Sequence, residues 1–86
     1  MDREGLAEQA LQQKFRITRF KAGYDLDQVD ELLDEVVLAL REGAEPEQIV
    51  QSLMAARLSQ TRWRDGYRID DVDDFLDSLV RSLSQG

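Results

Sequence analysis

The sequence contains an internal duplication in which equivalent residues lie 43 positions apart. Residues 18–40 read TRFKAGYDLDQVDELLDEVVLAL, and residues 61–83 read TRWRDGYRIDDVDDFLDSLVRSL. Self-similarity at a fixed spacing indicates one supersecondary unit that is repeated. Because there are two copies, we expect the apolar face of each to pack against the other in a closed pair. The identical positions are Thr18/Thr61, Arg19/Arg62, Gly23/Gly66, Tyr24/Tyr67, Asp27/Asp70, Val29/Val72, Asp30/Asp73, Leu33/Leu76, Asp34/Asp77, Val37/Val80 and Leu40/Leu83.

The segment after each Gly-Tyr pair has the apolar periodicity of a helix. Apolar side chains recur at i, i+3, i+4, i+7, i+8 and i+11 from Val29, and the second copy repeats this spacing from Val72. Such spacing places the apolar residues on one face of a helix, and acidic residues fill the opposite face. We expect the apolar faces to form a core seam between the repeats, made of Val29, Leu33, Val36, Val37, Leu40, Val72, Phe75, Leu76, Leu79, Val80 and Leu83.

A Gly-Tyr pair precedes each of these helices, and we expect both pairs to have a structural role. A glycine at this place indicates either a positive φ or a close approach by a neighbouring segment. The tyrosine stands where its ring can pack against the first helical turns as a hydrophobic staple. The expected turn and staple residues are Gly23, Tyr24, Gly66 and Tyr67.

The two helix starts differ in their capping residues. Asp25 is a suitable N-cap for the first helix, with Gln28 three positions later. Arg68 occupies the equivalent place in the second copy and is no such cap, so a start at Asp70 is open for the second helix. Acidic residues in the first turn of both helices suit the positive end of the helix dipole.

The remaining segments also read as helices. Gly43 is expected to stop the first acidic helix, and Pro46 suits the first turn of a helix that runs to about Arg57. Residues 3–15 form the equivalent segment of the first copy, and no stretch shows strand alternation. The predicted fold is therefore all-α, with four short helices in two helix-loop-helix repeats packed as a pseudo-twofold bundle. We expect one domain over residues 1–86, with repeats at 6–40 and 49–83.

The composition argues against several kinds of chemistry. The 86 residues include no cysteine and no histidine, which removes thiolate ligands, the commonest metal ligand and the commonest general base. The acidic runs at 25–27 and 70–71 lack the alternating ligands, central glycine and closing glutamate of a calcium-binding EF-hand loop. We therefore expect no metal, no cofactor and no enzyme activity.

The charge pattern points to binding surfaces. A net charge of −7 argues against nucleic acid as a ligand. Basic residues gather in residues 14–21 and 57–64, before the acidic helices, where they either neutralise the helix starts or contact an anionic surface. The longest apolar run, residues 36–40, is too short to span a membrane, and the first residues lack the features of a secretory signal. We expect a cytoplasmic protein.

The strings GYDLDQVDELLD and GYRIDDVDDFLD resemble the signature of the DivIVA domain, the N-terminal module of bacterial polar and septal scaffold proteins. The longer run FRITRFKAGYDLDQVDELLD resembles the version found in actinobacterial DivIVA-domain proteins, some of which carry the unit in tandem. The resemblance covers both repeats. It implies a non-catalytic interaction module of cell division or polar growth, with a protein partner that is a DivIVA-type scaffold or a second copy of the chain.

In that family the domain is a dimer whose crossed loops, just before the Gly-Tyr pair, contact anionic membrane. For this chain the resemblance implies peripheral contact at the inner membrane, pole or septum. It also implies that the second repeat replaces a partner subunit in a monomer, while exchange of repeats between chains would give a homodimer. The implied membrane or partner contacts are Arg19, Phe20, Lys21, Arg62, Trp63 and Arg64. From the residues alone, inward packing of the two aromatics as loop anchors is also open.

A second function is open from the same residues. The acidic helix faces, which carry Asp30, Asp34, Asp73 and Asp77, suit a soluble acidic helical regulator that binds a basic protein partner. The two hypotheses differ in the surface that binds, since the first uses the basic loops and the second uses the acidic helices.

Overall fold

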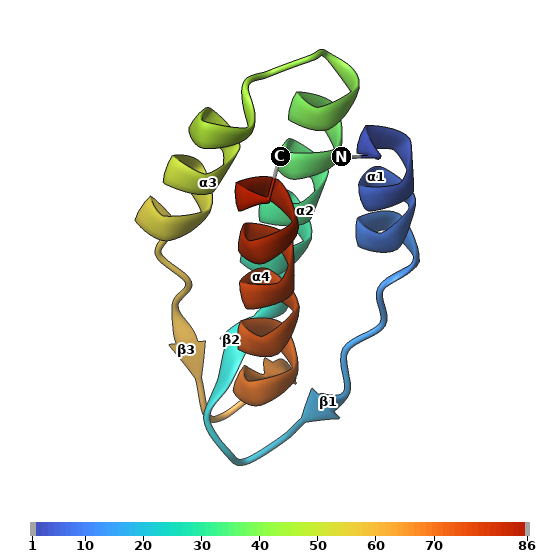
Figure 1. Cartoon of the computed structure of the whole chain (residues 1–86). Coiled ribbons are helices and arrows are strands. Elements are labelled where there is room, and N and C mark those ends of the chain that lie inside the picture. Colours follow the sequence, from blue (N-terminus) through green and yellow to red (C-terminus); the bar gives the residue numbers. More distant parts are fainter. Residues whose placement is uncertain (1, 86) are drawn as a thin grey trace.

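The computed structural model describes residues 2–85, in which two matching halves of the chain each form two helices and two short strands (Figure 1). The first half (residues 2–43) contains α1 (Arg3–Gln12), β1 (Ile17–Thr18), β2 (Gly23–Asp25) and α2 (Leu26–Arg41). The second half (residues 44–85) contains α3 (Pro46–Ala55), β3 (Gln60–Thr61), β4 (Gly66–Arg68) and α4 (Ile69–Ser84). The domain expected over residues 1–86 includes Met1 and Gly86, which lie outside the described residues.

The prediction of an all-α fold is wrong, because the strands form one antiparallel sheet in the order β1-β4-β2-β3. Each strand has only two or three residues. Such strands are too short to show the alternation of apolar and polar residues by which strands are recognised in a sequence. Parts of the segments predicted as loops are therefore sheet, and the architecture is mixed α/β.

The sheet interlocks the two halves of the chain. β1 pairs with β4 and β3 pairs with β2, so each edge strand lies against a strand of the other half. The central strands β2 and β4 pair with each other, and Tyr24 lies opposite Tyr67. The register on the two sides is equivalent when residue numbers are shifted by 43. The sheet therefore has an approximate twofold symmetry that relates the two repeats.

Gly23 and Gly66 begin the two central strands, where they allow the halves to approach closely. Both glycines are buried, and neither has a positive φ. A Cβ atom on Gly23 would lie 3.0 Å from the carbonyl oxygen of Tyr67, and one on Gly66 would lie 2.9 Å from the carbonyl oxygen of Tyr24. Of the two explanations open from the sequence, the close approach is the one that applies here.

The two long helices start in different ways. Asp25 is the N-cap of α2, and its carboxylate accepts a hydrogen bond from the Gln28 N–H at 3.0 Å. α4 starts at Ile69, one residue before the Asp70 start that the sequence left open, and its N-cap Arg68 makes no side-chain capping bond. A side-chain N-cap, the carboxylate of Asp25, is therefore present at the start of α2, and α4 has no such cap at the equivalent place.

α2 ends in a Schellman motif. Gly43 has a φ of +82°, its N–H bonds the carbonyl of Leu40, and the Ala44 N–H bonds the carbonyl of Ala39. This pattern satisfies the last carbonyls of the helix and needs a residue that tolerates the left-handed conformation. α1 and α3 have ten residues each, so both end before the predicted limits.

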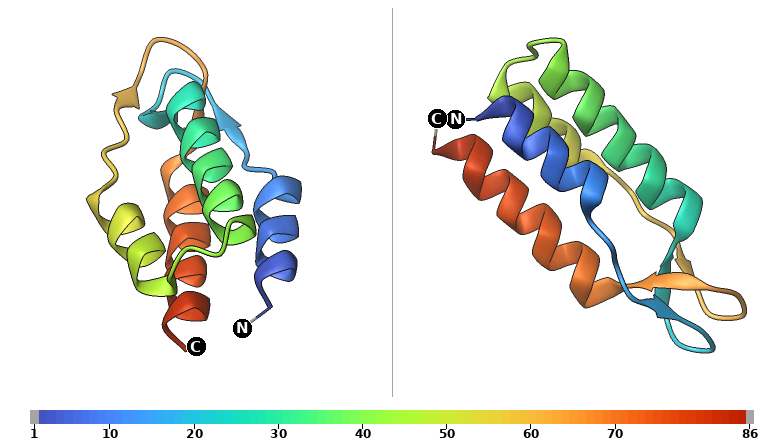
Figure 2. Two further views of the ribbon diagram at one scale, coloured as in Figure 1. Left: turned by 90° about the horizontal axis from the view of Figure 1, so that it is seen from above. Right: turned by 90° about the vertical axis from the view of Figure 1, so that its right-hand side faces the viewer.

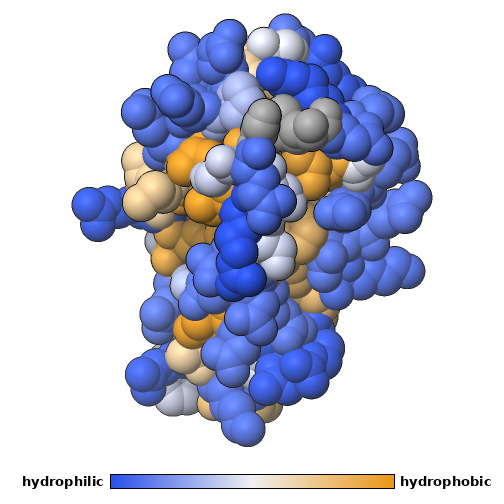
Figure 3. Space-filling view, in the orientation of Figure 1, coloured by the Kyte–Doolittle hydropathy of each residue, from blue (hydrophilic) through white to orange (hydrophobic). Residues whose placement is uncertain are grey.

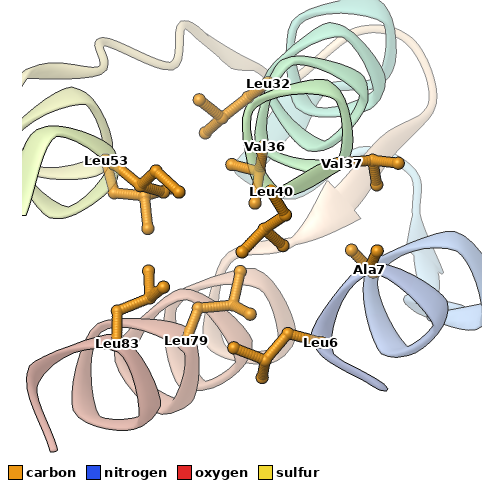
Figure 4. Close-up of a cluster of buried hydrophobic side chains, with 11 residues drawn as sticks. Leu6, Ala7, Leu32, Val36, Val37, Leu40, Leu53, Leu79 and Leu83 are labelled. Carbon is orange, nitrogen blue, oxygen red and sulfur yellow. The ribbon is translucent and has the colours of Figure 1, made fainter. Parts of the chain in front are cut away.

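An apolar core lies between the helices and is shared by the two halves (Figure 4). Leu40 of α2 and Leu79 of α4 are each 1% exposed and point into the same cluster. A second buried cluster lies nearer the sheet and contains Phe15, Val29, Leu33 and Val72. Among the expected seam residues, Phe75, Leu76 and Val80 are only partly buried. The main cluster consists of Leu6, Ala7, Ala10, Leu32, Val36, Val37, Leu40, Ile49, Leu53, Leu79 and Leu83.

The sheet lies at one end of the elongated molecule. The two loops that lead into β2 and β4, residues 19–22 and 62–65, project together beyond it (Figure 2). α1 begins and α4 ends at the opposite end (Figure 1). The molecule therefore has a loop end, defined by residues 19–22 and 62–65, and a helical body.

Candidate functional site: the loop end

The loop end exposes two large aromatic side chains. Phe20 is 73% exposed and Trp63 is 86% exposed, and they occupy equivalent places in the two loops. Phe20 also has a φ of +66°, a left-handed conformation that costs a residue with a Cβ about 1–2 kcal/mol. Inward packing as loop anchors, which was open from the sequence, is not what the structure shows for either aromatic.

Ion pairs fix the two loops relative to each other. The Arg19 guanidinium makes a two-point contact with the carboxylate of Asp65, which joins the first loop to the second. The Arg64 guanidinium donates to Asp25 at 2.7 Å, while the other oxygen of Asp25 caps α2. Since these pairs are exposed to solvent, they contribute little to the free energy of unfolding. They link the first loop to the second, and the second loop to the start of α2.

Two cations of the loop end remain available to a ligand. Lys21 and Arg62 are exposed, and within residues 2–85 neither makes an ion pair. Each stands next to one of the exposed aromatics in the sequence. The six predicted contact residues therefore divide into two aromatics, two paired arginines and two unpaired cations.

Beneath the loops, two symmetric hydrogen bonds join the halves. The Tyr24 hydroxyl donates to Asp73 at 2.8 Å, and the Tyr67 hydroxyl donates to Asp30 at 2.9 Å. Burial, and then the hydrogen bond to the neighbouring carboxylate, raises the pKa of both tyrosines to about 12. The tyrosine rings also pack on the cluster that contains Val29 and Val72. These contacts join the two halves directly beneath the loops.

Arg16 and Asp71 form a contact that sequence analysis missed. The Arg16 guanidinium donates to both carboxylate oxygens of Asp71, at 2.8 and 3.0 Å, and the Arg16 N–H donates to one of them at 3.0 Å. The side-chain hydrogen bonds, followed by the backbone bond, hold the pKa of Asp71 well below its usual range. The two residues are 55 positions apart and have no charged counterparts in the other repeat, so no local pattern could have indicated the pair.

Phe15 supports the loop end from the first half of the chain. It is 9% exposed, and its ring makes edge contacts with Tyr67 at 5.3 Å and Phe75 at 5.8 Å between centroids. Aromatic pairs in this arrangement stabilise a fold beyond their buried area. The segment between α1 and β1 is therefore packed against the second half.

The helical body carries no candidate for a membrane span or a metal centre. Within residues 2–85, none of the helices has the length and apolar character needed to cross a membrane. In the same part of the chain, no three acidic side chains come together in an arrangement suited to a metal ion.

Comparison with protein-family models, with curated proteins and with solved structures finds no match to this chain.

Proposed function

We propose that this chain is a non-catalytic interaction module of the DivIVA type that acts in bacterial cell division or polar growth. Its loop end binds the anionic inner surface of the membrane, and its helical body binds a protein partner. The observation that carries the membrane role is the exposure of Phe20 and Trp63 at one end of the molecule, next to unpaired cations.

The chemistry of the loop end suits a membrane surface. Aromatic side chains prefer the interfacial zone between lipid tails and water. Each lysine or arginine near an anionic leaflet adds about 1 kcal/mol of attraction, and Lys21 and Arg62 are free to supply it. The left-handed backbone of Phe20 also supports this role, because strained backbone conformations gather at functional sites.

The arrangement of the strands is a second line of support. In the DivIVA family, which the sequence resembles, the membrane-contacting loops cross just before the Gly-Tyr pair. In this chain the strands of the two halves pair antiparallel at Gly23-Tyr24 and Gly66-Tyr67, directly after the loops. The second repeat takes the place that a second subunit has in the family dimer.

The membrane contact depends on orientation. The net charge of the chain is −7, and the acidic faces of α2 and α4 repel an anionic leaflet. Within residues 2–85, the loop end is the one place that combines cations with exposed aromatics. The molecule therefore binds with this end toward the lipid and the helical body directed away. We expect weak, reversible binding that salt reduces.

The test is binding to lipid vesicles, read by the fluorescence of Trp63, the sole tryptophan of the chain. Phosphatidylglycerol vesicles should shift the emission to the blue and co-sediment with the protein, and phosphatidylcholine vesicles should do neither. Raising NaCl from about 0.1 to about 1 M shortens the screening length from about 10 to about 3 Å, and should release most of the protein.

Matched variants give the control. Phe20→Ala with Trp63→Ala should abolish co-sedimentation, and Lys21→Glu with Arg62→Glu should do the same. Leu38→Ala removes a side chain that is 58% exposed on α2, near the far end of the helical body, and should bind as the unaltered chain does. Equal binding by all variants, or no preference for the anionic lipid, would contradict the membrane role.

The cellular role has a separate test. A fluorescent fusion expressed in a rod-shaped bacterium should gather at poles or septa, and the double aromatic variant should become diffuse. A diffuse signal for the unaltered chain, despite vesicle binding in vitro, would contradict the division or polar-growth role alone.

The alternative is an acidic helical regulator that binds a basic protein partner and has no lipid contact. Asp34 and Asp77 are exposed at equivalent places on α2 and α4, which favours it. Charge reversal at these two positions should abolish partner binding under this alternative, while the loop variants should bind normally.

A further inference from the structure

The structure has two grooves at equivalent places in the two halves. The first lies between α1 and α2 and has a volume of about 280 Å³, and the second lies between α3 and α4 and has a volume of about 420 Å³. Each is lined by residues whose numbers differ by 43, such as Leu11 and Met54. The second groove is the larger of the two.

The side chains that separate the helices explain this difference. Ala7 and Ala10 of α1 are buried at 0% and 4% exposure, and their counterparts on α3 are Val50 and Leu53. The backbones of α1 and α2 are in closer contact than those of α3 and α4. The distance between packed helices depends on the side chains at the contact, so the small residues of α1 and the larger residues of α3 account for this difference.

As a result, the second groove has an apolar floor that is incompletely covered. Leu33 and Val37 on α2 are each 7% exposed, but their counterparts on α4, Leu76 and Val80, are only partly buried. Met54 at the edge of the groove is 77% exposed. Figure 3 shows apolar surface beside the polar outer face of α4, on the side toward α3.

The acidic edge of this groove determines the kind of partner that fits. Asp73 and Asp77 are one helical turn apart on α4 and line the groove together with Asp74. Leu76 and Val80 follow the same axis with the same spacing, so apolar and acidic surfaces run side by side along about two turns of helix. Charge complementarity across such a surface selects a partner that carries lysine or arginine beside an apolar stripe.

We propose that the groove between α3 and α4 binds a basic amphipathic helix of a protein partner. The apolar stripe of that helix covers Leu76, Val80 and the flexible side chain of Met54, which adapts to partner side chains. Its cations face Asp73 and Asp77. Amphipathic helices are commonly bound in grooves of this kind. This refines the protein-binding role proposed above, and its test uses no lipid, so that either proposal fails independently of the other.

The probe is a synthetic four-turn peptide of leucine and lysine with one apolar face, added to the chain labelled with ¹³C at its methionine methyl groups. The chain has two methionines; the Met54 methyl signal, which is assigned as the one that Met54→Lys removes, should shift on titration. A peptide of the same composition with its apolar face scrambled, and one with glutamate in place of lysine, should cause no shift.

Substitutions at equivalent places in the two grooves give the decisive comparison. Met54→Lys and Asp77→Lys should each weaken peptide binding by about tenfold or more, as expected for residues at the centre of an interface. The counterparts Leu11→Lys and Asp34→Lys should change it less than about twofold. All four positions are exposed, so we expect each variant to keep the fold. Thermal unfolding followed by circular dichroism checks this.

Three results would overturn the proposal. The first is the absence of a Met54 shift at a peptide concentration of about 1 mM, which shows that any binding is weaker than a Kd of about 1 mM. The second is equal weakening by both sets of substitutions, which indicates general charge attraction. The third is concentration-dependent self-association of the chain that Met54→Lys abolishes, which would identify a second copy as the occupant.

Discussion

At equivalent places in the two halves, the main chain makes the same contact and the side chains make different ones. The Arg68 N–H bonds the carbonyl of Arg16 at 2.9 Å, and the Asp25 N–H bonds the carbonyl of Ser59 at 2.9 Å. Shifting either pair by 43 positions gives the other. At the first of these contacts, where Arg68 bonds Arg16, the Arg16 side chain also forms an ion pair with Asp71.

At the second contact, where Asp25 bonds Ser59, the residues equivalent to Arg16 and Asp71 are the neutral Ser59 and Gln28. The Ser59 N–H donates to the Gln28 Oε1, and the Gln28 Nε2 donates to the Ser59 Oγ at 3.2 Å. A side-chain contact to the start of a long helix is therefore kept, but its chemistry is ionic on one side and neutral on the other. The duplicated fold depends on backbone pairing and close packing, and these leave the outer side chains free to diverge.

The largest expected effect is at the glycines that both halves share. Gly23→Ala and Gly66→Ala each place a Cβ against backbone atoms of the other half, and we expect each to lower the free energy of unfolding by about 3 kcal/mol. The two losses, measured by urea unfolding, should agree closely. Gly43→Ala, which meets no atom within 4 Å, should cost about 1–2 kcal/mol through its positive φ alone. A large difference between the first two variants would show that the halves are not equivalent.

The core substitutions Leu33→Ala and Leu76→Ala should lower the free energy of unfolding by different amounts, although they occupy equivalent places in the two halves. Leu33 is 7% exposed, and its replacement should cost about 3 kcal/mol, as for other buried leucines. Leu76 lies on the open groove and is partly buried, so its replacement should cost about half as much, because less apolar area returns to water. Urea unfolding measures both. Equal losses would contradict the difference between the two grooves.

Tyr24→Phe and Tyr67→Phe test the symmetric hydrogen bonds and should each cost about 1 kcal/mol at neutral pH. The pKa of each tyrosine is raised in the fold to about 12 from an ordinary value near 10. Their stabilising effect is therefore complete below about pH 10 and is lost as pH rises through about 12. Thermal unfolding between pH 9 and 12 should show a smaller alkaline loss for each phenylalanine variant. If both variants lose as much thermal stability between pH 9 and 12 as the unaltered chain does, the two hydrogen bonds do not have this role.

The smallest expected effect concerns the ionic and neutral contacts. The pKa of Asp71 is lowered in the fold, so its contribution to stability is present above the ordinary aspartate pKa of about 3.9 and is lost as pH falls below it. Asp71→Asn should therefore reduce the drop in melting temperature between pH 7 and pH 3. Gln28→Ala alters the neutral contact and should lower the melting temperature equally at both pH values. If the melting temperatures of both variants depend on pH in the same way, the ionic contact of Asp71 and the neutral contact of Gln28 do not differ as proposed.

Much of the helical structure was predictable because it is local. The periodicity from Val29 and from Val72 identified α2 and α4, and Asp25 and Gly43 identified the start and stop of α2. Each of these signals lies within a few residues of the element that it determines. The α1 and α3 limits were predicted less well, since neither helix has a strong stop signal.

The sheet could not be predicted in the same way. The partner of Thr18 is Gly66 and the partner of Tyr24 is Tyr67, and no pattern inside a strand of two or three residues indicates a pairing over more than 40 positions. The exposure of Phe20 was also open, because it depends on where the paired strands direct the loop. The identity of the two Gly-Tyr pairs was the one available hint that the repeats meet there.

The interlocked sheet makes each half of the chain depend on the other for its fold. Neither half contains a complete sheet, since each lends its first strand to the other. Cutting the connection at Gly43 would leave two fragments that are unstructured when apart and that recover the fold when mixed. Attached to two other proteins, such fragments would act as a small split reporter whose reassembly signals that the carriers have met.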